Sequence, residues 1–238
     1  MKSLLFLFAL ILTIPVSSQS VIDKTMISGG ITRSYKLYVP AVYTGTSSVA
    51  LVLNLHGLGS NSLQQMYYGN FRSISDTANF IIVHPQGTTS ATLGATYWNA
   101  YFGGTVNDIN FLSELIDTIS ANYNIDANRI HSTGMSNGGY MSLALAAALD
   151  DKIASVASVT GSMTNLFPSS AVNTKPISIL QIHGTADSTV KYAGDANSKS
   201  IQNVINYWIG HNNTTSTPAV YSVPNINTSD GCTATRYT

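Results

Sequence analysis

The stretch that most constrains the fold of this chain is Ile130–Tyr140, which reads IHSTGMSNGGY. A short apolar approach leads into a Gly-x-Ser-x-Gly pattern, and a helical pattern follows over residues 140–149. Side chains in place of Gly134 and Gly138 would collide with the strand and the helix, so glycine there permits a sharp turn. Such a turn raises Ser136 Oγ to the mouth of a sheet, where the free N–H groups of the helix start favour developing negative charge. The pattern predicts a nucleophilic serine; the alternative is an ordinary glycine-rich turn.

Apolar runs typical of strands alternate along the chain with one-sided patterns typical of helices. The expected strands are residues 34–39, 50–55, 80–83, 153–159 and 177–182, and the expected helices are residues 73–79, 108–123, 140–149 and 198–209. We expect residues 88–104 to be irregular and residues 212–231 to form a loop with one weak strand. This alternation predicts an α/β fold, in which helices cover both faces of a mostly parallel sheet and form a three-layer sandwich.

The first 20 residues predict a signal peptide. Lys2 supplies a positive start, residues 4–14 are apolar, and small residues follow. The apolar run is too short for a membrane span, so secretion is expected. The remaining residues, 21–238, suit one α/β domain.

The charge of the chain is balanced and sparse. The formal net charge is zero and 9% of residues are charged, which points to neither nucleic acid nor a membrane surface as a partner. No cluster of Cys, His or Asp ligands and no phosphate loop occurs, so no metal or cofactor is expected, and we expect a monomer. Cys232 is the single cysteine, which leaves a free thiol, an intermolecular bridge or a missing partner as alternatives.

A serine nucleophile needs donors for an oxyanion, a base, and an acid that orients the base. We expect the donors to be the backbone N–H groups of Leu58, in the loop after a buried strand, and of Asn137, which follows the serine. The side chain of His56 is expected to brace that loop. Asp187, at the end of ISILQIHGTAD, is the expected acid; a turn or capping aspartate is the alternative.

The base does not follow from the pattern. A histidine is expected after Asp187 in the chain, and His211 alone satisfies that order. It lies at the end of an expected helix, where a histidine usually meets free carbonyl groups, so it is a weak candidate. His183 precedes the acid, which is the wrong order for this kind of site.

Several motifs together resemble the secreted polyhydroxybutyrate depolymerase and feruloyl esterase group, α/β hydrolases close to carbohydrate esterase family one. The resemblance covers roughly residues 25–238 and rests on GMSNGGYM, LHGLGSN, Tyr97-Trp98-Asn99, DINFLSELID and IHGTAD. It implies a catalytic histidine in a Gly-Gly-Gly-His-type loop beyond Thr238, and therefore a chain that is incomplete at its C-terminus and weakly active alone. Many relatives carry a cysteine at the position of Thr214, so the resemblance also implies that Cys232 lacks its partner.

The expected function is that of a secreted serine esterase. Ser136 would attack an ester carbonyl, the two amides would hold the oxyanion, and Asp187 would orient the histidine. The expected substrate is a small ester, a feruloylated or acetylated polysaccharide, or a polyester. Trp98 and Tyr97 are either a stacking wall for that substrate or aromatic residues of the core. A noncatalytic binding module and a peptidase of the same fold remain alternatives.

Overall fold

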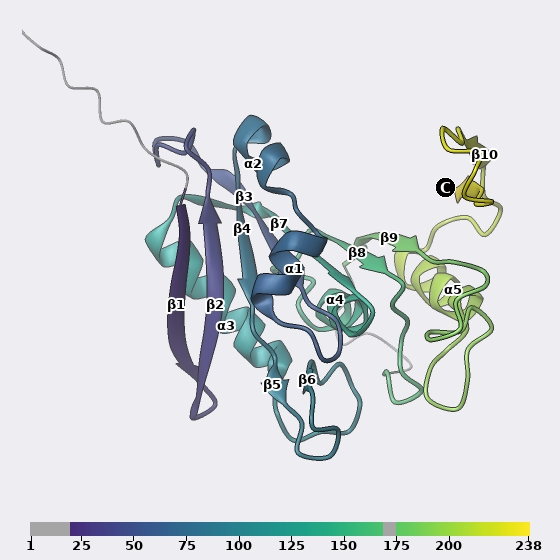
Figure 1. Ribbon diagram of the computed structural model, residues 1–238, viewed down its shortest axis with the longest axis horizontal. Helices are drawn as coiled ribbons and strands as arrows, with labels where there is room; N and C mark the ends of the chain where they lie inside the picture. Colours follow the sequence, from purple (N-terminus) through teal and green to yellow (C-terminus); the bar gives the residue numbers. More distant parts are fainter. Residues whose placement is uncertain (1–19, 169–174) are drawn as a thin grey trace, which may run out of the picture.

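One large sheet organises the molecule (Figure 1). The computed structural model describes residues 20–168 and 175–238, so nearly all of the expected signal peptide lies outside the described residues. In spatial order the strands are β1 (Ser20–Ser28), β2 (Ile31–Val39), β4 (Phe80–Pro85), β3 (Val49–Leu55), β7 (Ile125–Met135), β8 (Ser155–Val159) and β9 (Ser178–Ile182). Pairing is parallel from β4 through β9 and antiparallel at β1–β2 and β2–β4, which confirms the mostly parallel sheet.

The strands in the middle of the sheet are buried on both faces. Consecutive residues, which point to opposite faces, are buried in both strands: Leu53, Asn54 and Leu55 of β3, and Ile81, Ile82 and Val83 of β4. This explains their nearly continuous apolar runs. β1 was not predicted, because five of its nine residues are exposed and its apolar alternation is weak.

Helices cover both faces of this sheet. α1 (Ser62–Tyr68) and α2 (Arg72–Ala78) pack on β4 in front of the sheet in Figure 1, and α3 (Asp108–Asn122) lies behind it. α4 (Asn137–Ala148) packs on α3 and on β3, β7 and β8, and α5 (Ile201–Asn212) lies near β9. The expected three layers are therefore present. Within the described ranges, no helix is long and apolar enough to cross a membrane.

The helices differ in how well their sequence patterns predict them. α3 buries the predicted apolar stripe from Leu112 to Ile119 against the core, together with Phe111, whereas Tyr123, the expected last member, is only half-buried. α4 begins three residues before the expected start and is buried on almost every side, so it has no stripe. α1 was not predicted, because only three of its residues are buried; its Asn61 N-cap, which accepts the Gln64 N–H, is the signal that could have located it.

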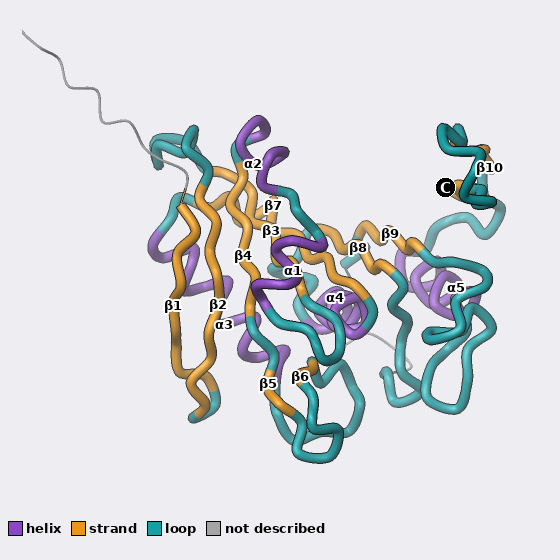
Figure 2. Tube along the Cα trace, in the orientation of Figure 1, coloured by secondary structure: helices purple, strands orange, loops and turns teal. Residues whose placement is uncertain are grey.

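Two small hairpins lie outside the main sheet. β5 (Thr88–Thr89) pairs with β6 (Thr96–Tyr97) within the segment expected to be irregular. β10 (Val220–Val223) is the expected weak strand, and it pairs with β11 (Ala234–Tyr237). Figure 2 shows this second hairpin standing away from the sheet, and every residue of its strands is exposed. Cys232, in the connection between the two strands, is free and exposed.

Candidate active site

Ser136 occupies a strained turn between β7 and α4. Its backbone has φ 54° and ψ −119°, a left-handed region that non-glycine residues rarely adopt. A Cβ atom on Gly138 would lie 2.2 Å from the Leu55 carbonyl oxygen, and one on Gly134 would lie 2.5 Å from the Gly138 carbonyl carbon. The sharp, glycine-dependent turn predicted from the sequence is therefore present. The Ser136 N–H donates to the Val159 carbonyl at 2.8 Å, which ties the turn to the end of β8.

The loop after β3 lies directly against this turn. A Cβ atom on Gly57 would be 3.6 Å from Ser136 Cβ and 3.4 Å from the Met135 carbonyl oxygen. Leu58 follows, with an exposed side chain. Among the described residues, no acceptor receives the N–H of Leu58 or that of Asn137, the first residue of α4. Two unused backbone donors beside a serine can stabilise an oxyanion.

His56 braces this loop, as expected. Its ring is fully buried, and Nε2 accepts the Gly87 N–H at 2.9 Å. The proton therefore sits on Nδ1, which donates to the Gly57 carbonyl at 2.8 Å. Burial lowers the pKa of His56 and keeps the ring neutral. With both nitrogens occupied, this histidine serves the loop and is not free to move a proton.

Trp98 belongs to the core, and the prediction that it forms a stacking wall is wrong. It is fully buried, its Nε1 donates to the His56 carbonyl at 2.9 Å, and its ring centroid lies 4.9 Å from that of His56. The Asn137 side-chain amide bonds both backbone groups of Trp98: Oδ1 accepts the Trp98 N–H at 2.6 Å, and Nδ2 donates to the Trp98 carbonyl at 3.0 Å. The same correction applies to Tyr97, which is only 9% exposed.

Asp187 lies on the loop after β9, with its two carboxylate oxygens in different surroundings. Oδ1 accepts the N–H groups of Thr189 and Val190, each at 2.9 Å, and these bonds lower the pKa of Asp187. Oδ2 lies 3.6 Å from Nε2 of His183, a buried ring whose closest contact at that nitrogen is the Val190 carbonyl at 2.6 Å. The carboxylate thus closes a turn, as the alternative reading held. Among the described residues, Oδ2 has no hydrogen bond and remains available as an acceptor.

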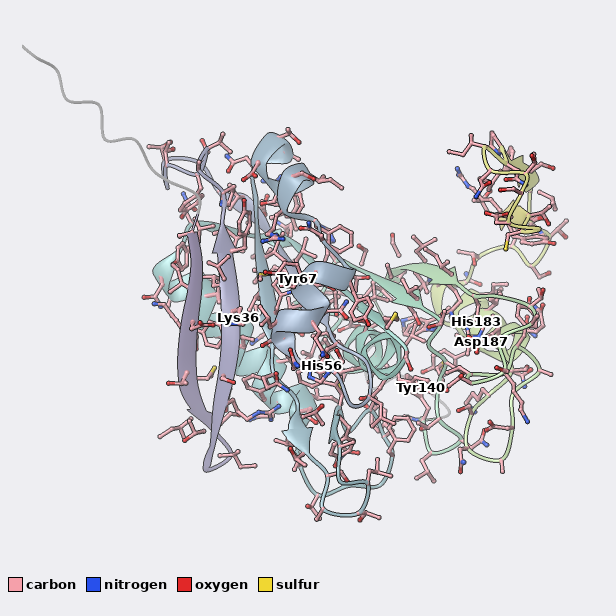
Figure 3. All side chains as sticks on the ribbon, viewed as in Figure 1. Lys36, His56, Tyr67, Tyr140, His183 and Asp187 are labelled. Carbon is pink, nitrogen blue, oxygen red and sulfur yellow. The ribbon has the colours of Figure 1, made fainter. Side chains whose placement is uncertain are left out.

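Ser136 and Asp187 lie at the same edge of the sheet. The Ser136 N–H donates to the carbonyl of Val159, the last residue of β8, and the Thr160 N–H donates to the carbonyl of Ile182, the last residue of β9. The strands β7, β8 and β9 therefore end at the same level along the sheet. Two strand spacings separate the β7 and β9 loops by roughly 10 Å. Burial raises the pKa of Tyr140, one turn after the serine, and the charges of Asp195 and, least, of Asp187 act in the same direction. Figure 3 shows Tyr140, His183 and Asp187 in one region of the molecule.

None of the five histidines bridges these two side chains through a contact in the structure. His211, the weak candidate, bonds to the Lys175 carbonyl at 2.9 Å and packs edge-on against Trp208. Lys175 precedes β9, whereas Asp187 follows it, and a five-residue strand spans roughly 17 Å. The structure therefore does not bring His211 to Asp187.

Sequence reasoning missed a buried ion pair beside the site. Arg33 of β2 and Asp108 at the start of α3 are both buried, with Nη2 and Oδ1 2.6 Å apart. The second carboxylate oxygen of Asp108 accepts the Asn99 N–H at 2.8 Å, so the pair holds the segment that follows Trp98. The sequence does show an arginine beside an expected strand, but it does not indicate which acidic residue pairs with that arginine.

Comparison with known proteins places the chain. The family described as Phospholipase/Carboxylesterase matches residues 41–218. A bifunctional acetylxylan esterase/xylanase of Neocallimastix patriciarum is 30% identical over 163 residues, which cover 68% of this chain and 22% of that protein. Feruloyl esterase D of Neurospora crassa is 27% identical (69% and 56% covered), and poly(3-hydroxyalkanoate) depolymerase C of Paucimonas lemoignei is 29% identical (70% and 42%). This chain thus spans about a fifth to about half of these relatives, and the matches confirm the resemblance predicted from the motifs.

Solved structures agree on the fold. A thermostable esterase superposes with a TM-score of 0.61 at 18% identity and covers 83% of this chain and 52% of its own. A ferulic acid esterase superposes with a TM-score of 0.51 at 19% identity and covers 60% and 59%. At these identities the likeness establishes an α/β-hydrolase architecture and nothing finer.

Proposed function

The chain belongs to the phospholipase/carboxylesterase family, and on that premise we propose that it is a serine esterase that cleaves carboxylic esters through an acyl-enzyme on Ser136. One observation carries the proposal. Ser136 has a strained backbone at the start of α4, and the adjacent N–H groups of Leu58 and Asn137 have no other acceptor among the described residues. This arrangement suits attack on a carbonyl whose oxygen becomes negative.

The proposed chemistry has two halves. Ser136 Oγ attacks the ester carbonyl, the two amides stabilise the tetrahedral oxyanion, and the alcohol leaves. Water then attacks the acyl-enzyme and releases the acid. A base must take the serine proton, and Asp187 Oδ2 is the acceptor that would orient an imidazole there.

The relatives support a substrate class. Their names specify acetylxylan, feruloyl and poly(3-hydroxyalkanoate) esters, so we propose an acyl ester carried on a polysaccharide or a polyester. The predicted leader supports export of the protein to a place where such polymers occur.

Rescue by imidazole tests the proposal on the chain itself. With no histidine bridging Ser136 and Asp187, we expect slow turnover of 4-nitrophenyl acetate, because an unactivated serine is a poor nucleophile. The oxyanion donors and binding alone supply roughly 10³–10⁴-fold over water. Added imidazole should accelerate the wild-type chain with saturation, whereas Ser136→Ala should show only the linear catalysis that imidazole gives in solution.

Two further variants complete that experiment. Asp187→Ala should weaken the imidazole response, since the ring loses its orienting acceptor, and Ser113→Ala, on α3, should behave as wild type. Equal imidazole responses in wild type and Ser136→Ala would exclude the serine mechanism and favour a noncatalytic binding module. Faster turnover of matched amides than of esters would favour a peptidase.

A further inference from the structure

The loop that follows Trp98 is built around a single side-chain amide. Asn99 Oδ1 accepts the N–H groups of Phe102 and Gly104, each at 3.2 Å, and its Nδ2 donates to the carbonyls of Gly104 and Val106, each at 2.8 Å. Tyr101 within this loop has φ 63°, a strained value for a non-glycine residue. Strain of this kind persists where surrounding contacts enforce it, so the loop is held in one shape.

The strained residue separates two aromatic side chains. Tyr101 packs inward, with its ring centroid 5.1 Å from that of Phe167, and its carbonyl accepts the Thr164 hydroxyl at 2.9 Å. Phe102, the next residue, keeps 41% of its surface exposed. A large apolar ring presented to solvent by a rigid loop loses little conformational freedom when it binds a ligand.

Phe102 packs against the first turn of the helix that follows the candidate nucleophile. Its ring centroid is 5.3 Å from that of Tyr140, whose N–H donates to the Ser136 carbonyl at 3.0 Å. Tyr140 thus lies one turn after Ser136, and long side chains on a helix lean toward its N-terminus. Hydrogen bonding of the Tyr140 hydroxyl to Ser198 Oγ at 2.6 Å fixes that ring as a support for Phe102.

The loop that carries Phe102 is uncharged. No residue from 99 to 106 carries a charge. Leu166, which is 67% exposed, approaches from the neighbouring loop: a Cβ atom on Gly103 would lie 3.6 Å from Leu166 Cδ1. The two loops thus present an aromatic ring and an aliphatic side chain to solvent.

We propose that Phe102, supported by Tyr140, is the wall against which the enzyme seats the acyl group of its ester, and that it selects acyl groups with an aromatic ring over acetyl. The inference rests on the proposed esterase function and assigns to Phe102 the contact that Trp98 and Tyr97 are too buried to make. An aromatic acyl group gains an offset or edge-to-face contact with the Phe102 ring, and acetyl gains none.

Selectivity between two esters with the same leaving group tests this assignment. For 4-nitrophenyl ferulate and 4-nitrophenyl acetate, measured with saturating imidazole, Phe102→Ala should lower the ferulate-to-acetate ratio of kcat/KM by roughly threefold to tenfold. The loss should fall mainly on the ferulate ester. Phe102→Tyr, which keeps the ring, should restore the ratio, and Tyr67→Ala, an exposed aromatic on α1, should leave it unchanged.

Binding of methyl ferulate, followed by ligand-observed NMR, separates the two proposals. Weaker binding by Phe102→Ala without any serine-dependent turnover would support the aromatic wall and contradict the esterase. Serine-dependent turnover with the same ester ratio and the same methyl ferulate affinity in Phe102→Ala would overturn the wall and leave the esterase standing.

Discussion

His84 is an imidazole that the fold buries without a partner. It lies on β4 opposite Lys36 of β2, it is 1% exposed, and neither ring nitrogen has a hydrogen bond among the described residues. Burial, and then the charges of Arg72 and Lys36, lower the pKa of His84 to about 4. The unfolded chain binds a proton near pH 6.5, so between pH 6.5 and 4 the unfolded state holds more protons and stability falls as the pH falls.

Replacing His84 with phenylalanine should flatten this dependence. Between pH 7.5 and 4.5 the wild-type chain should lose about 2–3 kcal/mol more unfolding free energy than His84→Phe, as measured by urea denaturation. His56 and His131, whose pKa values burial also lowers, are present in both proteins and cancel in the comparison. Parallel pH profiles for the two proteins would contradict the assignment.

At the residue scale, sequence reasoning located what local chemistry dictates. The Gly-x-Ser-x-Gly pattern is local in sequence and predicted the turn at Ser136, although the Cβ atom that Gly138 lacks would meet Leu55 of β3. The burial of Trp98 depends on Asn137, which is 39 residues away, and no local pattern records that contact. Phe102 was missed for a similar reason, because its exposure follows from the bonds of the Asn99 amide.

Replacing one glycine of α4 and one glycine of α5 with alanine should change the stability of the protein in opposite directions. Gly138→Ala in α4 forces a Cβ against the Leu55 carbonyl oxygen. It should lower the unfolding free energy by at least about 3 kcal/mol, since the atoms that the Cβ meets belong to the backbone and cannot rotate away. Gly210→Ala in α5 meets no atom within 4 Å and should add about 0.5–1 kcal/mol through the higher helix propensity of alanine. Thermal or urea unfolding measures both, and a destabilised Gly210→Ala would show that α5 is not the open helix described.

Whole elements were predictable where one strong apolar pattern marks them. β3, β4 and α3 fall within two residues of the expected bounds. β1 and α1 were not predicted because few of their side chains are buried. The start of α4 was predicted three residues too late, because burial on every side leaves no periodic signal. The pairing of β10 with β11 connects residues across a polar loop, which sequence periodicity does not record.

At the scale of the molecule, the Arg33–Asp108 pair joins the antiparallel end of the sheet to the loop that carries Phe102. Asp108→Asn should destabilise the protein by about 3–5 kcal/mol, because it leaves a buried guanidinium without its counter-charge. Asp117→Asn, which removes the partner of Lys152 from a largely exposed pair, should cost at most about 1 kcal/mol. Equal losses in urea denaturation would show that the buried pair is not what holds these parts together.

The arrangement of the site across the molecule was predictable only in part. Parallel strands end at one edge of a sheet, so the sequence order of strands and loops placed Ser136 and Asp187 on the same side. It could not assign a base, because the partner of a carboxylate is set by three-dimensional placement rather than by spacing. His211 meets the chain-order rule and still lies at the far end of β9.

The hydrogen bonds between the Asn137 amide and Trp98 also protect the Asn137-Gly138 sequence from deamidation. Asparagine followed by glycine deamidates most readily, because the next backbone nitrogen can attack the side-chain carbonyl, expel ammonia and leave a succinimide that opens to aspartate or isoaspartate. In the fold, both ends of this amide are bonded to Trp98 and the Gly138 nitrogen is held in the first turn of α4, so that attack is blocked. Each unfolding event removes this protection. An aspartate formed there has no N–H to return to the Trp98 carbonyl, so heat damage at the turn accumulates as a covalent change that refolding cannot undo.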